Sequence, residues 1–321
     1  MKVERIGDAT LHEGDALERL REMPERSARC CVTSPPYWGL RDYGHEGQLG
    51  LERTPEEYVE KLVEVFREVR RVLANDGTLW LNLGDSYTSG GRANFGPDNP
   101  GDKQHSQNAV KSTSRAPQPP GLKPKDLVGV PWRVAFALQA DGWWLRSDII
   151  WAKPNPMPES VTDRPTKAHE YLFLLSKSQR YYYDAEAIAE PSVDLPGVSR
   201  GGSLSRFGPS EQFVAGQAHR GEKEYASNGT RNRRTVWTIP TQPFPGAHFA
   251  VMPQALVEPC ILAGSEPGDT VLDPFAGSGT VGVVASRHGR GFVGIELNPE
   301  YAEMARRRIS GPLFASVRRE A

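Results

Sequence analysis

The sequence has little cysteine, no long apolar run and almost no net charge, and each shortage excludes a class of protein. No stretch of its 321 residues approaches the ~20 consecutive apolar residues of a membrane-spanning helix. The three cysteines, Cys30, Cys31 and Cys260, cannot all pair with one another and lack metal-ligand spacing. Because no N-terminal signal pattern is visible either, we expect a cytoplasmic protein with reduced, buried thiols, no metal and no membrane partner.

The charge balance leaves only local clusters to hold an anionic partner. Lys and Arg number 39 against 40 Asp and Glu, so the formal net charge is −1 at pH 7. Such a chain has no global basic field. A nucleic acid would have to be held by local groups such as Arg231 to Arg234, so overall charge neither supports nor excludes that partner.

Strand and helix patterns alternate at both ends of the chain. A helix is expected from Thr54, which can cap it, with Pro55 at its first position and apolar residues on one face as far as Gly77. Short apolar strands precede it at "ARCCVT" and follow it at "TLWLNL". This order of strand, helix and strand favours an α/β sheet.

Two stretches interrupt this order. Residues 88–125 and 187–236 are rich in Gly, Ser, Asn, Pro and Gln, and their charges lean basic. Their composition is that of solvated loops. Long irregular insertions in an α/β domain also carry binding surfaces, so both interpretations stay open.

The C-terminal part carries the most specific pattern. "TVLDPFAGSGT" predicts a strand, a glycine-rich loop and a helix from Thr280, and "FVGIELNPEY" predicts a second strand and helix. Asp273 and Glu296 then end adjacent strands, at the edge where doubly wound sheets bind ligands. A carboxylate at the end of the second strand is well placed to accept hydrogen bonds from ribose hydroxyls.

The glycine-rich loop lacks the lysine of a phosphate-binding loop, and this distinguishes among adenosine-containing ligands. A phosphate-binding loop would carry a Lys before its helix, but here Thr280 follows Gly279 directly. Asp273 would repel a pyrophosphate and attract an ammonium group. S-adenosylmethionine has both an ammonium group and a ribose, so we predict it as the cofactor.

Taken together, "DPFAGSGT", "GIELNPEY" and "TSPPYWGL" resemble the motifs of the DNA amino-methyltransferases, in the permuted order of their β group. The resemblance implies a Rossmann-like, S-adenosylmethionine-dependent methyltransferase sheet with irregular DNA-facing insertions. It makes the tetrad Ser34, Pro35, Pro36 and Tyr37 catalytic. It also implies a set of residues at the cofactor, namely Asp15, Thr33, His248, Phe249, Asp273, Phe275, Gly277, Ser278, Gly279, Thr280, Glu296 and Asn298.

The chemistry of an aromatic amine explains such a tetrad. The nitrogen lone pair is delocalised into the ring of the base, so the amine is a poor nucleophile until hydrogen-bond acceptors localise that pair. The Ser34 hydroxyl and the Pro35 carbonyl could both accept from it, and two prolines stiffen the chain that carries them. Tyr37 could stack on the base, which must first leave the duplex.

The resemblance also divides the chain and suggests its target. It implies a catalytic half at 1–186 with the insertion 88–125, a target-recognition region at 187–240 and a cofactor-binding half at 241–321. Within the family, Ser at the first tetrad position accompanies cytosine N4 more often than adenine N6, so cytosine is favoured and adenine stays open. Polar residues that could contact DNA are Lys153, Asn155, Ser160, Arg164, Arg231, Arg233 and Arg234.

Other functions stay open at this stage. An RNA or protein-amide methyltransferase would share the chemistry, although such enzymes usually place the cofactor motif first. A DNA-binding module without catalysis is disfavoured by the intact Ser34, Tyr37, Asp273 and Glu296. The expected partners are DNA, a cognate restriction endonuclease and a second copy of the chain in a homodimer.

Overall fold

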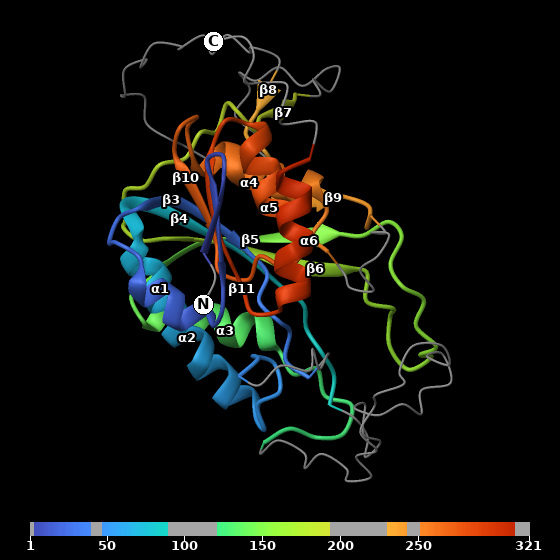
Figure 1. Cartoon of the computed structure of the whole chain (residues 1–321). Helices are drawn as coiled ribbons and strands as arrows, with labels where there is room; N and C mark the ends of the chain where they lie inside the picture. Colours follow the sequence, from blue (N-terminus) through green and yellow to red (C-terminus); the bar gives the residue numbers. More distant parts are fainter. Residues whose placement is uncertain (1–2, 40–46, 89–120, 193–229, 243–250, 312–321) are drawn as a thin grey trace, which may run out of the picture.

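Within residues 3–39, 47–88, 121–192, 230–242 and 251–311, which are those that the computed structural model describes, the chain forms a nine-stranded sheet (Figure 1). The strands lie in the order β1-β2-β11-β10-β3-β4-β6-β5-β9. Their bounds are β1 Val3–Ile6, β2 Ala9–Glu13, β3 Ala28–Thr33, β4 Leu73–Leu83, β5 Trp144–Ala152, β6 His169–Ser176, β9 Val236–Thr238, β10 Thr270–Asp273 and β11 Gly291–Glu296.

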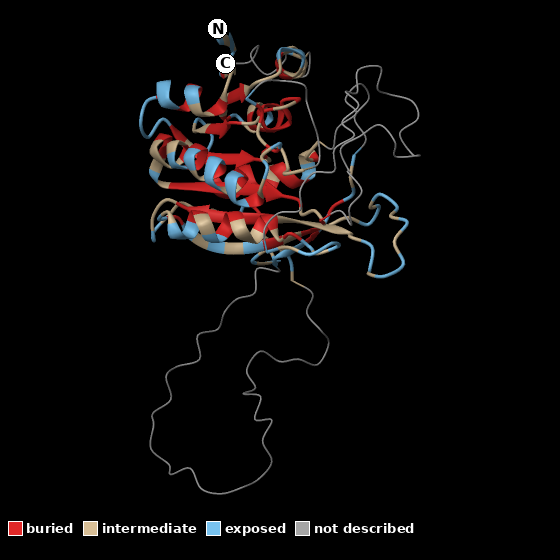
Figure 2. Ribbon diagram, turned by 90° about the horizontal axis from the view of Figure 1, so that it is seen from below, coloured by how far each residue is buried: buried red, intermediate tan, exposed pale blue. Residues whose placement is uncertain are grey.

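Helices cover both faces of this sheet (Figure 1). One face packs against α1 (Ala16–Glu22), α2 (Pro55–Val72) and α3 (Val130–Ala140). The other packs against α4 (Gln254–Gly264), α5 (Thr280–Arg287) and α6 (Pro299–Ile309). Figure 2 shows buried residues in the sheet and exposed residues on the outward sides of the helices. The short strands β7 (Glu190–Pro191) and β8 (Thr230–Arg231) pair separately.

The direction of the strands decides which ends meet. β2, β11, β10, β3 and β4 run parallel to one another, whereas β1 runs antiparallel to β2, and β6 runs antiparallel to both β4 and β5. The carboxyl ends of the parallel strands therefore share one edge of the sheet with the amino end of β6. Chain order also reverses between β10 and β3, and such a reversal forms the crevice in which open α/β sheets bind ligands.

The predicted helix from Thr54 is present but ends earlier than expected. The Thr54 hydroxyl accepts a hydrogen bond from the Glu57 amide (3.1 Å), and the predicted apolar face is buried. The helix ends at Val72 instead of running to Gly77, because Leu73 already pairs with Ala28 of β3. A Cβ at Gly77 would lie 2.8 Å from the Arg29 carbonyl oxygen, so glycine permits this close pairing.

The cysteines are free and buried, as predicted. Cys30 and Cys31 are neighbours on β3, so their side chains enter the cores on opposite faces of the sheet. Burial raises the pKa of Cys30 to about 12 and that of Cys31 well above its ordinary value. Neither thiol is therefore poised to react at neutral pH.

The C-terminal elements are confirmed, and they lie in the middle of the sheet. β10, α5 and β11 form one unit that sits between β2 and β3, so the last strands of the chain separate two of its first. This is the permuted arrangement that the motif order predicts. The domain bounds stay predictions, because most of both irregular stretches lies outside the described residues. Among the described helices, none combines the length and apolar character needed to cross a membrane.

Candidate active site

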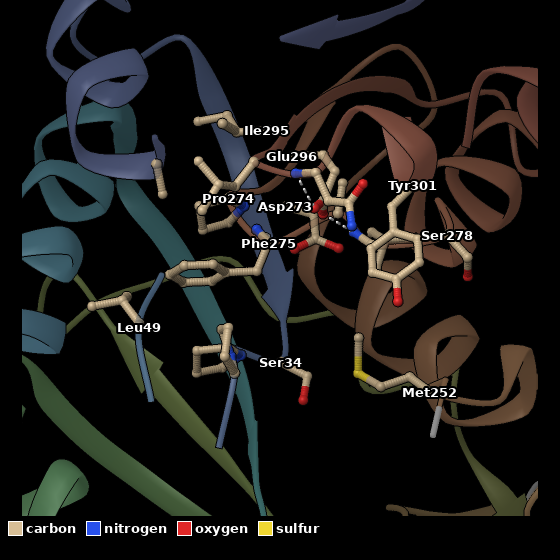
Figure 3. A pocket seen from close by; sticks show the side chains of 18 of the residues that line it. Ser34, Leu49, Met252, Asp273, Pro274, Phe275, Ser278, Ile295, Glu296 and Tyr301 are labelled. Atoms are coloured by element: carbon tan, nitrogen blue, oxygen red, sulfur yellow. Dashed lines mark hydrogen bonds between the residues drawn. The ribbon is translucent and has the colours of Figure 1, made fainter. Parts of the chain in front are cut away.

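A cavity of ≈ 310 Å³ opens at the carboxyl edge, where β10 and β3 meet. Figure 3 shows Asp273 and Glu296 near its centre, with Tyr301 and Met252 on one side, Phe275 and Leu49 on the other, and Ser34 below. We call Asp273, Gly277, Glu296 and Asn298 the β10–β11 side of the cavity. We call Ser34, Tyr37, Asn82 and Glu170 the β3–β6 side.

Glu296 is fixed by backbone amides. Gly277 N–H donates to Oε2 (2.7 Å), and Asn298 N–H donates to Oε1 (2.8 Å). A carboxylate can accept about four hydrogen bonds, and these two amides place one on each oxygen. A carboxylate held in this way could also accept from the neighbouring hydroxyls of a ribose.

Asp273 is the more deeply buried of the two acids, with 2% of its surface exposed. Its Oδ1 accepts from the Thr33 hydroxyl (2.7 Å) and from the Phe275 amide (3.1 Å). Burial, together with a smaller effect of the Glu296 charge, raises the pKa of Asp273 to about 7, although the two hydrogen bonds lower it. None of the described residues forms an ion pair with Asp273, and a buried acid of this kind suits a ligand with an ammonium group.

The glycine-rich loop turns sharply into α5. Gly277 and Gly279 have φ angles of +51° and +76°, which only glycine adopts without strain. A Cβ at Gly279 would lie 2.8 Å from the Cβ of Ala305, so this glycine brings α6 against the loop. The Ser278 and Thr280 hydroxyls accept from the Arg308 guanidinium at 2.6 and 3.2 Å, which ties the loop to the same helix.

The tetrad leaves the end of β3 as a turn that α2 holds in place. The Tyr58 hydroxyl of α2 donates to the Pro36 carbonyl (2.8 Å). A Cβ at Gly84 would lie 2.5 Å from the Tyr37 ring, so the ring lies directly against the backbone that follows β4. Ser34, Pro35, Pro36 and Tyr37 all line the cavity.

Side chains from β4, from β6 and from the residue that follows β5 join behind the tetrad. The Ser34 hydroxyl donates to the Tyr37 hydroxyl (3.3 Å), which donates to Glu170 Oε2 (2.8 Å) and also lies 3.1 Å from Asn82 Oδ1. Asn82 Nδ2 donates to the same Glu170 oxygen (3.2 Å), and the Lys153 ammonium forms an ion pair with Oε1. Burial, and then the charge of Glu170, raise the pKa of Tyr37 well above its ordinary value.

Comparison with known proteins identifies the family to which this cavity belongs. A model of N6/N4 methyltransferases, described as "DNA methylase", matches residues 28–307. The chain belongs to the DNA methylase family. This membership confirms the family predicted from the motifs and S-adenosylmethionine as the cofactor.

Individual relatives agree with this assignment. The methylase is 53% identical over 307 residues to the Type II methyltransferase M.Cfr9I of Citrobacter freundii, a match that covers 95% of this chain and 89% of that protein. Its fold is similar to that of the cytosine-N4-specific PvuII DNA methyltransferase, with 21% identity, a TM-score of 0.62 and coverage of 95% and 87%. The fold is also similar to that of a putative DNA modification methylase from Thermus thermophilus, solved with S-adenosyl-L-methionine. That match has 24% identity and a TM-score of 0.57, and it covers 94% of this chain and 92% of the other.

The other residues predicted at the cofactor have mixed placements in the methylase. Asp15 lines the cavity and also caps α1 through the Glu18 amide (3.0 Å). Thr33 is completely buried behind the cavity and reaches it only through Asp273. His248 and Phe249 lie outside the described residues, although Val251 and Met252, which follow them, line the cavity.

Four residues predicted to contact DNA belong to the connection between β5 and β6, which leaves the sheet at the edge with the cavity. Lys153 is turned inward, with 15% of its side chain exposed and its ammonium on Glu170, so its placement favours a role inside the site. Asn155 is held by the backbone of Thr241, and Ser160 is exposed. Arg164 pairs with Glu159 (2.7 Å) and lies over the Tyr87 ring (3.8 Å).

The other three residues predicted to contact DNA, Arg231, Arg233 and Arg234, do not line this cavity. Arg231 and Arg234 both pair with Glu190, and Arg233 lies 4.5 Å over the Trp237 ring. Arg233 and Arg234 line a second cavity of ≈ 200 Å³ together with Arg146. Because they precede β9, which is parallel to β5, they approach the sheet from the amino side.

Motif reasoning missed Asn82 and Glu170, both of which line the cavity of the methylase. Their sequence context is that of ordinary strand residues. Only the antiparallel direction of β6, which brings its amino end to the active edge, would have identified Glu170. Within the described residues, no group of three His, Cys, Asp or Glu side chains is placed to hold a metal ion.

Proposed function

We propose that this DNA methyltransferase transfers a methyl group from S-adenosylmethionine to the N4 amine of cytosine, within one recognition sequence. The observation that carries the proposal is Ser34, a hydroxyl residue at the first tetrad position on the wall of the cavity that also contains Asp273 and Glu296. Within the family that the motifs resemble, Ser at this position accompanies methylation of cytosine N4 more often than of adenine N6. The fold neighbour named cytosine-N4-specific supports the same choice.

The β10–β11 side would hold the cofactor. Asp273 would face its ammonium group, Glu296 its ribose and Asp15 the adenine, with Phe275 and Ser278 completing the wall. When bound, S-adenosylmethionine supplies an electrophilic methyl group on a sulfonium. The acids and apolar side chains of this wall fit a cationic ligand with one polar and one aromatic end.

The β3–β6 side would hold and activate the amine. Ser34 Oγ and the Pro35 carbonyl would accept its hydrogens, which concentrates the lone pair on nitrogen. Tyr37 would pack against the base after it leaves the duplex, a step that costs a few kcal/mol. Orienting the two reactants accounts for most of the expected acceleration, because no covalent enzyme intermediate is needed.

The DNA would approach along the carboxyl edge. The connection with Asn155, Ser160 and Arg164 leaves the sheet there, and residues 187–240 would read the sequence. Because the relative M.Cfr9I is named a Type II methyltransferase, we include a restriction endonuclease with the same recognition sequence as the functional partner.

Product analysis tests the proposal. The purified protein is incubated with DNA, RNA and a protein extract and with methyl-labelled cofactor, and the modified nucleosides are identified by mass spectrometry. We expect label in DNA as N4-methylcytosine, at a single sequence context when the DNA is sequenced. N6-methyladenine would replace the proposed target base, and label confined to RNA or protein would overturn the proposal.

A further inference from the structure

Glu170 is an acid on the cavity wall to which neither the motifs nor the family assignment give a role. It is the second residue of β6, and β6 pairs antiparallel with β4 so that Asn82 lies opposite Leu172. Its side chain therefore reaches the β3–β6 side of the cavity from a strand that starts at the active edge. Only 14% of the Glu170 side chain is exposed.

The hydrogen bonds around Glu170 have one consistent direction. An ionised carboxylate can only accept, so the Tyr37 hydroxyl directs its single hydrogen to Oε2 at 2.8 Å. The alternative acceptor, Asn82 Oδ1, is uncharged and more distant at 3.1 Å. The Tyr37 oxygen is then the acceptor for the hydrogen of Ser34 (3.3 Å).

This direction determines what Ser34 offers to the cavity. A hydroxyl has one hydrogen and two lone pairs. When its hydrogen points to Tyr37, Ser34 Oγ can present only lone pairs to the cavity, which is what an amine donor requires. A Ser34 hydroxyl turned the other way would place its hydrogen against the hydrogens of the amine.

Lys153 supplies the opposite charge beside Glu170. The ammonium forms an ion pair with Oε1, and only 15% of the Lys153 side chain is exposed. The same ammonium lies 4.2 Å from the centre of the Trp151 ring, which also lines the cavity. The carboxylate is thus held from one side by a cation and from the other by Tyr37 and Asn82.

We propose that Glu170 is a positioning residue for methyl transfer, which acts through Tyr37 on Ser34 and takes up the proton that the amine releases. This inference deepens the proposed function and depends on it. As the new N–C bond forms, one N–H bond of the amine breaks and its proton passes to Ser34 Oγ. The Ser34 proton moves to the Tyr37 oxygen, and the Tyr37 proton moves to Glu170 Oε2.

The charges balance in this step. Before transfer, the methyl donor carries one positive charge and Glu170 one negative charge. Afterwards the donor sulfur is a neutral thioether, the methylated base is neutral and Glu170 is an uncharged carboxylic acid. No further acid, base or metal is needed, and Glu170 returns its proton to solvent as the product leaves.

Glu170→Gln in the full-length protein tests the inference, because glutamine keeps the shape of the side chain but cannot take up the proton. We expect kcat on DNA to fall at least about a hundredfold, the scale of general acid–base catalysis. Affinity for S-adenosylmethionine by calorimetry and the thermal unfolding midpoint should stay near their wild-type values. The matched control is Glu68→Gln on α2, which removes an ion pair of similar exposure to Arg71 and should retain full activity.

A double-mutant cycle separates positioning from simple structural support. Tyr37→Phe keeps the ring and removes the link, so the double variant with Glu170→Gln should lose no more activity than either single variant. If the losses of activity in the two single variants multiplied in the double variant, the two residues would act independently, which would overturn the inference that Glu170 acts through Tyr37. A Glu170→Gln variant with wild-type kcat would overturn the inference alone, whereas a wild-type protein that methylates no DNA amine would overturn the proposed function first.

Discussion

The two sides of the cavity are built by different means. On the β10–β11 side, both acids accept from backbone amides of the same strand–helix–strand unit: Glu296 from Asn298 and Gly277, and Asp273 from Phe275, with the Thr33 hydroxyl of β3 as a further donor to Asp273. On the β3–β6 side, side chains hold one another across 45 and 133 residues, from Tyr37 to Asn82 and to Glu170. The first side is built mainly within the unit of β10, α5 and β11, whereas the second requires strands from distant parts of the chain.

This difference predicts that substitutions on the β3–β6 side lower kcat, that substitutions on the β10–β11 side lower cofactor affinity, and that the loss of kcat is the larger effect. Ser34→Ala removes the proposed acceptor and should lower kcat about a thousandfold, as loss of one preorganised hydrogen-bonding group does elsewhere. Affinity for S-adenosylmethionine, measured by calorimetry, should change little. Ser176→Ala at the far end of β6 is the control, and a large loss of cofactor affinity in Ser34→Ala would show that the two sides are not independent.

The opposite failure is expected on the β10–β11 side. Glu296→Ala removes the acceptor of two amides and the proposed ribose contact, so cofactor affinity should fall by about 2 kcal/mol, roughly thirtyfold. At saturating cofactor, kcat should recover most of its wild-type value. Glu13→Ala, the register partner on β2, provides the control, and unchanged calorimetric affinity in Glu296→Ala would refute the ribose assignment.

Cofactor affinity should also depend on pH through Asp273. With a pKa of about 7, this acid is mostly protonated at pH 6 and mostly ionised at pH 8, and a cationic ligand prefers the ionised form. Affinity should therefore rise about tenfold between these pH values, with proton release on binding. Calorimetry in buffers of different ionisation enthalpy measures both, and Asp273→Asn should abolish the dependence.

The same raised pKa makes the stability of the folded protein change with pH in the opposite direction to cofactor affinity. Because the folded protein binds this proton more tightly than the unfolded chain, the contribution of Asp273 to stability is present at low pH. It is lost as pH rises from about 4 towards 7.

The smallest effect is expected from the bond that joins the two sides. Thr33→Val removes the hydroxyl that donates to Asp273 and should cost about 1 kcal/mol of unfolding free energy. Since that hydrogen bond lowers the pKa of Asp273, the pH midpoint for cofactor binding should move upward. Thr78→Val on β4, which is equally buried but makes only a weak 3.8 Å contact to Cys30, is the comparison. An unshifted midpoint would count against the coupling.

Local patterns in the sequence sufficed for most of the fold and for one side of the site. The cap at Thr54, the glycines of the 273–280 loop and the acids that end β10 and β11 all lie in short motifs, so their spacing was informative. Trp143 and Trp144 show the limit: two adjacent residues of one type differ in burial, Trp143 being buried and Trp144 41% exposed, because neighbouring residues of an extended chain point to opposite sides.

On the β3–β6 side, the motif predicted Ser34 and Tyr37, but Asn82 and Glu170 could not be predicted in this way. Nothing in "HEYLFLLS" distinguishes Glu170 from a solvated strand end until β6 is known to be antiparallel. Lys153 was expected to contact DNA, because its ion-pair partner Glu170 lies on another strand and cannot be recognised from the local sequence. The predictions of a homodimer, a cytoplasmic location and the DNA contacts of Arg231, Arg233 and Arg234 stay predictions.

The central position of β10 and β11 has a consequence for biosynthesis. β2 and β3 emerge early from the ribosome but do not pair with each other, because their partners in the sheet are β11 and β10. A growing chain therefore keeps two open strand edges until its C-terminal unit is made, and such edges can pair with other chains. Methyl transfer can begin only when that unit has closed the gap, so incomplete chains cannot modify DNA.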